Sequence, residues 1–161
     1  MAVEIQVPKL AKVYVGGSLL GYTRNGCEIE SVPHMIPVPG DEHGGDDGPP
    51  IDYQHLPTLY RIHLSLTKFE KSILETIEAG ITGGTAGTYA TADIGVTYIG
   101  GSKIYRVTIV TTTSSWVRNF PLCIPTAPPA YNLGTRFMEA TVEFMALRNQ
   151  STGLVWDQTG I

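Results

Sequence analysis

This sequence lacks the motifs that mark most enzymes and metal sites. It has two cysteines in 161 residues, Cys27 and Cys123, and they do not form the CxxC spacing of a zinc or redox site. There is no GxSxG motif, neither cysteine has a histidine and an acid at a recognisable motif distance, and the four histidines form no HExxH pattern. We therefore expect no enzyme activity, no metal and no cofactor, with both thiols reduced and partly buried.

Basic clusters and long apolar runs are also missing. The lack of a Lys/Arg-rich stretch argues against phosphate-driven binding to the outside of nucleic acids. No apolar run approaches the roughly 20 residues of a membrane span. Met1 is followed by Ala2-Val3-Glu4 rather than by a basic and then an apolar segment. We expect no signal peptide, no membrane partner and assembly in a cytoplasm.

The charge imbalance lies in one segment. The chain has 15 acidic and 11 basic residues, and Asp41, Glu42, Asp46 and Asp47 account for the whole net charge of -4. They belong to residues 38–53, a long stretch with few apolar residues and many turn formers, which is typical of a functional or disordered loop. Strand patterns flank it, so it is expected to project as the tip of a hairpin. Its candidate contact residues are Asp41, Glu42, His43, Asp46, Asp47, Pro49, Pro50, Asp52 and Tyr53.

Carboxylates in a glycine-rich loop also suit Ca²⁺. The spacing in residues 38–53 does not match an EF-hand, however, and no glutamate stands at the closing position. A solvated or partner-facing acidic tip is therefore favoured over a cation site.

The clearest structural signal is a strand that runs into a helix between Pro57 and Gly80. Apolar residues occupy every second position from Tyr60 to Leu66, the period of a strand with one buried face. Thr67 and Glu70 have the spacing of a capping box, which predicts a helix over residues 67–79 that ends at Gly80. The expected apolar face of the helix is Phe69, Ile73, Leu74 and Ile77.

The rest of the chain reads as strand, turn and loop. Residues 11–15 and 18–22 predict a hairpin around Gly16-Gly17, with another turn at Asn25-Gly26. Prolines within 27–37 suit an edge strand or an arm that leaves the body. Further extended segments are expected at 95–99, 103–113, 118–124, 137–147 (the longest, with Met138 on its core face) and 154–156, with a small-residue loop at 81–93 and a turn at Gly100-Gly101.

These elements predict a fold that is mainly β with one α-helix. We expect a β-sheet structure with the single helix laid against it and a long projecting loop, in one structural domain over residues 1–161. No internal repeat and no linker composition divides the chain.

The order of the elements resembles that of bacteriophage tail tube proteins. An N-terminal hairpin is followed by a long loop between early strands, a strand running into one helix, and a β-rich second half. The ending Val142-Glu143-Phe144-Met145-Ala146-Leu147-Arg148-Asn149 looks like that family's closing strand, and Asn119-Phe120-Pro121 through Leu133-Gly134 resembles the segment before it.

The resemblance implies a β-sandwich or barrel flanked by the single helix. It also implies a virion structural protein that forms rings of six copies, stacked into a hollow tube through which DNA passes. Its partners would be itself and other tail proteins, with DNA present only in transit. In that family the early loop reaches the adjacent ring, and one sheet lines the channel with acidic or neutral residues. Glu139 and Glu143 are the channel-lining candidates. Four residues apart on a strand, they would lie roughly 13 Å apart, too far for paired acid–base catalysis.

Two alternatives stay open at this point. One is another virion structural protein, such as a head decoration, connector or tail terminator protein. The other is a Ca²⁺-assisted module that binds carbohydrate or a receptor through the acidic loop.

Overall fold

The structure is a computed structural model that describes residues 10–40, 48–82, 104–111, 116–134 and 138–158. These residues form a mainly β fold with one helix, as predicted. The strands are β1 (Ala11–Val15), β2 (Ser18–Val38), β3 (Asp52–Phe69), β4 (Tyr105–Thr111), β5 (Val117–Pro125), β6 (Ala130–Leu133) and β7 (Met138–Ala146), and the helix is α1 (Lys71–Thr82).

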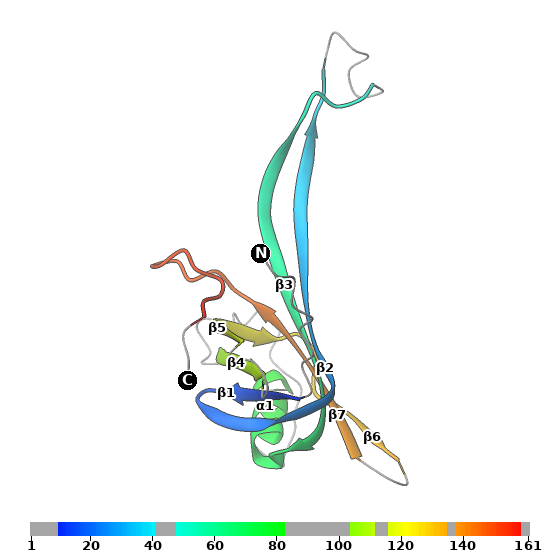
Figure 1. The fold of residues 1–161 in the computed structure, drawn as a ribbon, viewed down its shortest axis with the longest axis vertical. Coiled ribbons are helices and arrows are strands. Elements are labelled where there is room, and N and C mark those ends of the chain that lie inside the picture. Colours follow the sequence, from blue (N-terminus) through cyan, green and yellow to red (C-terminus); the bar gives the residue numbers. More distant parts are fainter. Residues whose placement is uncertain (1–9, 41–47, 83–103, 112–115, 135–137, 159–161) are drawn as a thin grey trace, which may run out of the picture.

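Six of the strands close into a barrel. The sheet order is β3-β2-β1-β4-β5-β7-β6, and an additional pairing of β3 with β7 joins the two sides into a ring. Every strand pair is antiparallel. β6 stays outside the ring because it pairs only with the first residues of β7. β2 and β3 run on past the barrel as a long hairpin, while α1 packs on the body away from that hairpin (Figure 1).

The core fills the barrel with the inward residues of each strand. Ile62, Leu64 and Leu66 of β3 are fully buried, which confirms the predicted alternation. The helix adds Leu74 and Ile77, also fully buried, from its apolar face. The remaining core residues come mainly from β1, β4, β5 and β7, among them Val13, Val107, Ile109, Phe120, Val142 and Phe144.

The N-terminal hairpin has the predicted turn. Gly16 and Gly17 have φ values of 60° and 87°, the left-handed region that a two-residue hairpin turn requires at both positions. β2 pairs with β1 from Ser18 to Thr23, as the sequence indicates.

The helix begins later than the capping box predicts. Strand β3 continues through Phe69, because Lys68 and Phe69 still pair with Tyr22 and Gly21 of β2. The N–H of Glu70 also donates to the carbonyl of Leu20 at 2.7 Å. Strand pairing therefore takes the backbone groups that the capping box would have used. Glu70 precedes the helix instead, and its carboxylate accepts a hydrogen bond from the Ser72 hydroxyl at 3.0 Å.

Gly80 does not end the helix. α1 extends to Thr82, so the predicted loop over 81–93 begins two residues inside the helix. The rest of that loop, the strand at 95–99 and the Gly100-Gly101 turn lie outside the described residues.

Three further predictions are corrected by the strand register. Asn25-Gly26 lies within β2, where the pairing jumps from Thr23↔Leu66 to Cys27↔Leu64, so the extra residues form an irregularity rather than a turn. The longest strand is β2 rather than β7. Met138 is 42% exposed because it pairs with β6 beyond the barrel.

The C-terminal segment is held to the barrel without forming the predicted strand at 154–156. Asn119 and Asp157 exchange two backbone hydrogen bonds of 2.9 Å, and the Asn119 side-chain amide donates to the Asp157 carboxylate at 3.1 Å. The Arg118 guanidinium stacks 3.6 Å from the centre of the Trp156 ring. These contacts fix the last described residues on β5.

At Gly21, β2 lies close to the backbone of β3. A Cβ atom there would collide with the carbonyl oxygen of Lys68 and would lie 2.9 Å from Cα of Phe69. Both obstacles are backbone atoms, so a rotamer change cannot relieve the contact.

We expect Gly21→Ala to lower the free energy of unfolding by about 1–3 kcal/mol or more, because the two strands must separate. Chemical denaturation followed by circular dichroism measures this change. Ser18→Ala is the matched control, since Ser18 lies on the same strand and is exposed. Equal stability of the two variants would contradict the tight crossing.

Candidate assembly surfaces

The most distinctive surface is the part of the β2–β3 hairpin that leaves the barrel, called here the arm (residues 31–38 and 52–59). The register of the two strands continues to Val38↔Asp52 (Figure 1). β1 pairs with β2 only as far as Thr23, and β7 pairs with β3 only from Tyr60 to Leu66. Among the described residues, each strand of the arm therefore has one partner strand and one open edge.

Proline positions the irregularity within the arm. The register shifts between Val32 and His34, so that Pro33 lies opposite the extra residue of β3 near Pro57. Proline has no N–H to donate, and an irregular pair is where a ladder tolerates it. The sequence predicts an edge strand or an arm for residues 27–37; residues 31–37 belong to the arm, whereas residues 27–30 pair within the body.

The end of the arm exposes large apolar side chains. The exposed fractions are 56% for Met35, 49% for Ile36, 63% for Ile51 and 56% for Tyr53. Met35 and Ile36 are neighbours on a strand, so the apolar residues occupy both faces of the ribbon. An isolated two-stranded hairpin is marginally stable in water. Packing against a partner surface would therefore stabilise an arm of this composition.

Four of the nine predicted loop residues lie among the described residues. Pro49, Pro50, Asp52 and Tyr53 are exposed at the end of the arm, and the Asp52 carboxylate accepts the Tyr53 N–H at 2.7 Å. The other predicted loop residues, Asp41, Glu42, His43, Asp46 and Asp47, lie outside the described residues. Within the part of the chain that is described, no group of three His, Cys, Asp or Glu residues is arranged to hold a metal ion.

A second surface is the acidic sheet face, formed by the outward side chains of β2, β3 and β7. The predicted residues Glu139 and Glu143 lie on it, alternating with the buried residues of β7. Glu28 and Glu30 of β2 lie across β3 from them, because Glu28 pairs with His63 and His63 pairs with Glu143. The ionisable residues of this face are Glu28, Glu30, Arg61, His63, Glu139 and Glu143.

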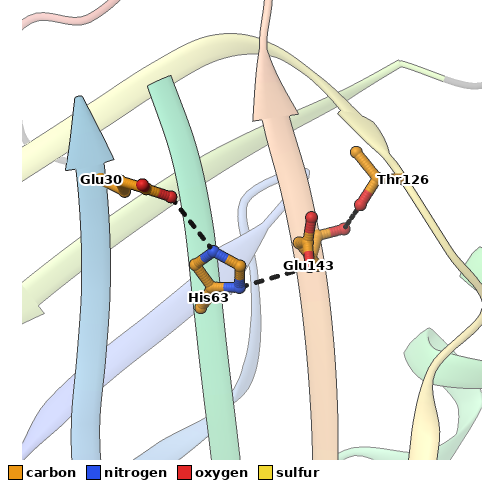
Figure 2. A network of polar contacts seen from close by, with 4 residues as sticks. All are labelled: Glu30, His63, Thr126 and Glu143. Atoms are coloured by element: carbon orange, nitrogen blue, oxygen red, sulfur yellow. Dashed lines mark hydrogen bonds and ion pairs between the residues drawn. The ribbon is translucent and has the colours of Figure 1, made fainter. Parts of the chain in front are cut away.

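His63 lies between two of these carboxylates. Its Nδ1 is 3.3 Å from Oε2 of Glu143, and its Nε2 is 3.8 Å from Oε2 of Glu30 (Figure 2). Glu139 accepts a 2.6 Å hydrogen bond from the Ser65 hydroxyl. The imidazole thus links three adjacent strands across the acidic sheet face.

Sequence patterns alone do not identify Glu28, Glu30 and His63 as residues of the acidic sheet face. The alternation within residues 27–37 places the two glutamates on one side of a strand, but only the register shows that this side faces the same way as Glu143. His63 belongs to the predicted strand alternation from Tyr60 to Leu66, but sequence spacing does not identify the carboxylates that it contacts.

The same sheet has two open sides. β2, β3, β7 and β6 are adjacent in that order, and in the described part of the chain no strand pairs with the far side of β6 or with β2 beyond Thr23. Open edges present unpaired backbone N–H and C=O groups, which is the arrangement used for strand addition between molecules.

No protein-family model matches this chain, and no curated protein matches its sequence. Within the described ranges, no helix is long and apolar enough to cross a membrane.

The cysteines are free and do not suit nucleophilic chemistry. Burial, with a smaller contribution from the nearby Glu28 carboxylate, raises the pKa of Cys27 to about 12. Burial also raises the pKa of Cys123 to about 12, against a smaller opposing effect of a backbone hydrogen bond from Val107. The thiolate is the reactive form, so both side chains are inert near neutral pH.

We expect both thiols of the folded protein to react with a disulfide reagent at pH 8 far more slowly than those of the urea-unfolded chain. A rise in pKa from 9.0 to about 12 leaves about a thousandfold less thiolate. The stability linked to the protonated thiols is present below pH 9 and is lost as pH rises from 9 to 12. Rapid labelling of the folded protein at pH 8 would contradict this assignment.

Proposed function

We propose that this protein is a subunit of a bacteriophage tail tube. Copies of the chain form rings, and the rings stack into a hollow tube through which DNA passes. The observation that carries the proposal is the arm, which exposes apolar residues on both faces and has open edges. A surface of this kind gains stability from neighbouring copies of the same chain, and the resemblance of the element order supports that choice of partner.

Lateral contact follows from the sheet of β2, β3, β7 and β6. Its two open sides allow β6 of one copy to pair with β2 of the next, which would extend one sheet around a ring. The ring size of six comes from the resemblance. Such a ring presents one face of the shared sheet inward.

The acidic sheet face suits that inward position. Glu28, Glu30, Glu139 and Glu143 outnumber the one arginine beside them, Arg61. A negatively charged wall repels phosphate and prevents the DNA from binding as it slides through. The proposal therefore places the chain in the virion, with itself and other tail proteins as partners and DNA only in transit.

Other virion positions, including a head decoration, connector or tail terminator protein, share the need for self-association. The open arm together with two open sheet edges favours the tube, because it provides contacts along two directions. Most of the acidic residues on which a Ca²⁺-assisted binding module would depend, those at 41–47, lie outside the described residues.

Negative-stain electron microscopy of the concentrated protein tests this function. We expect rings or hollow tubes for the unsubstituted chain and loss of assembly for Ile51→Asp/Tyr53→Asp, because charges replace apolar contacts on the arm. The variant should stay folded, since both side chains are more than half exposed.

Leu154→Asp is the matched control, because Leu154 is 48% exposed but lies outside the arm. It should assemble as the unsubstituted chain does. A protein that stays a stable monomer at high concentration would refute the tube.

A further inference from the structure

A second projecting hairpin lies at the end of the molecule opposite the arm. It consists of β6 and the first residues of β7 (138–141), and is called here the extension (Figure 1). Leu133 is 77% exposed, Met138 42% and Tyr131 36%. The two ends of the long axis therefore both expose apolar side chains.

The apolar residues of the extension share one face. Tyr131 pairs with Ala140, which is buried in the core, and Leu133 pairs with Met138. Asn132 and Glu139 pair on the other face, which continues the acidic sheet face. The extension is therefore apolar on its barrel side and polar on its outer side.

The arm has apolar residues on its outer side as well as on its barrel side. Glu28 and Glu30 lie on the acidic sheet face, and alternate residues of β2 on the same side continue as Val32, His34, Ile36 and Val38. Leu56 joins them, because it pairs with His34. Gln54 and Asp52 lie on the same side, because they pair with Ile36 and Val38. The outer side of the sheet thus changes from acidic on the body to a mixture of apolar and polar residues on the arm.

We propose that the extension of a second copy lies over this outer side of the arm. The occupant is the face of Tyr131, Leu133 and Met138, and it packs on Ile36, Val38 and Leu56. This inference rests on the proposed function and identifies the surface that receives the arm when rings stack.

Charge continuity supports that occupant. An arm left uncovered would place Ile36, Val38 and Leu56 in the channel wall between rings. With the extension on top, Glu139 and Asn132 face outward and the polar wall continues across the junction. The contact joins different surfaces at opposite ends of the molecule, so it repeats without closing and builds an open-ended stack.

Disulfide trapping tests the contact. Ile36→Cys and Leu133→Cys proteins are mixed, assembled and oxidised, so that only contacts between copies can give covalent dimers. The control replaces Ile36→Cys by Met35→Cys, the neighbouring residue on the other face of the arm. We expect dimers to form about tenfold faster for the 36/133 pair, since disulfides require Cα atoms to be close.

Equal or faster trapping of the 35/133 pair in assembled tubes would overturn the inference and leave the proposed function intact. Absence of tubes from the unsubstituted protein would refute both. As a second measurement, Leu133→Lys should raise the concentration needed for assembly by about tenfold, since it places a charge on an apolar face, while Leu154→Lys should not. Unchanged assembly of Leu133→Lys would also overturn the contact.

Discussion

The pairing of β2 with β3 is the interaction on which the rest of this structure depends. Within the body it forms part of the barrel wall and ends at the tight crossing of Gly21 over Lys68, from which the chain turns into α1. Outside the body the same ladder continues as the arm. One antiparallel register thus sets the barrel, the start of the helix and the direction of the projecting surface.

The two parts of this hairpin differ in what stabilises them. In the body, Ile62, Leu64 and Leu66 are fully buried against residues of other strands and of the helix. In the arm, backbone hydrogen bonds remain but no core lies beneath them, and Met35 and Tyr53 are each 56% exposed. Hydrogen bonds between two strands alone contribute little net stability in water. The arm is therefore the part of the fold whose stability we attribute to neighbouring copies.

Local patterns were enough to predict much of this fold. The alternation from Tyr60 to Leu66, the Gly16-Gly17 turn and the buried face of β7 depend on neighbours in sequence, and each is confirmed. The helix start was wrong because the capping box at Thr67 competes with pairing to Tyr22 and Gly21, which is a long-range contact. Local chemistry cannot decide such a competition without the partner strand.

For the candidate surfaces too, local patterns predict one part and long-range strand pairing decides the other. Glu139 and Glu143 were identifiable because they alternate with apolar residues within one strand, whereas Glu30 and His63 join them only through the register of β2, β3 and β7. Prolines in residues 27–37 indicated an edge strand or an arm, but the length of the arm depends on where β1 and β7 stop pairing. Those end points follow from the closure of the barrel, which no single segment encodes.

Hydrogen–deuterium exchange of the arm, measured on the monomer and on the assembled protein, tests the central claim most directly. The account predicts rapid exchange of arm amides in the monomer, slow exchange in the assembly, and little change in the buried strands of the barrel. Arm amides that are already protected in the monomer, or that stay unprotected after assembly, would contradict it.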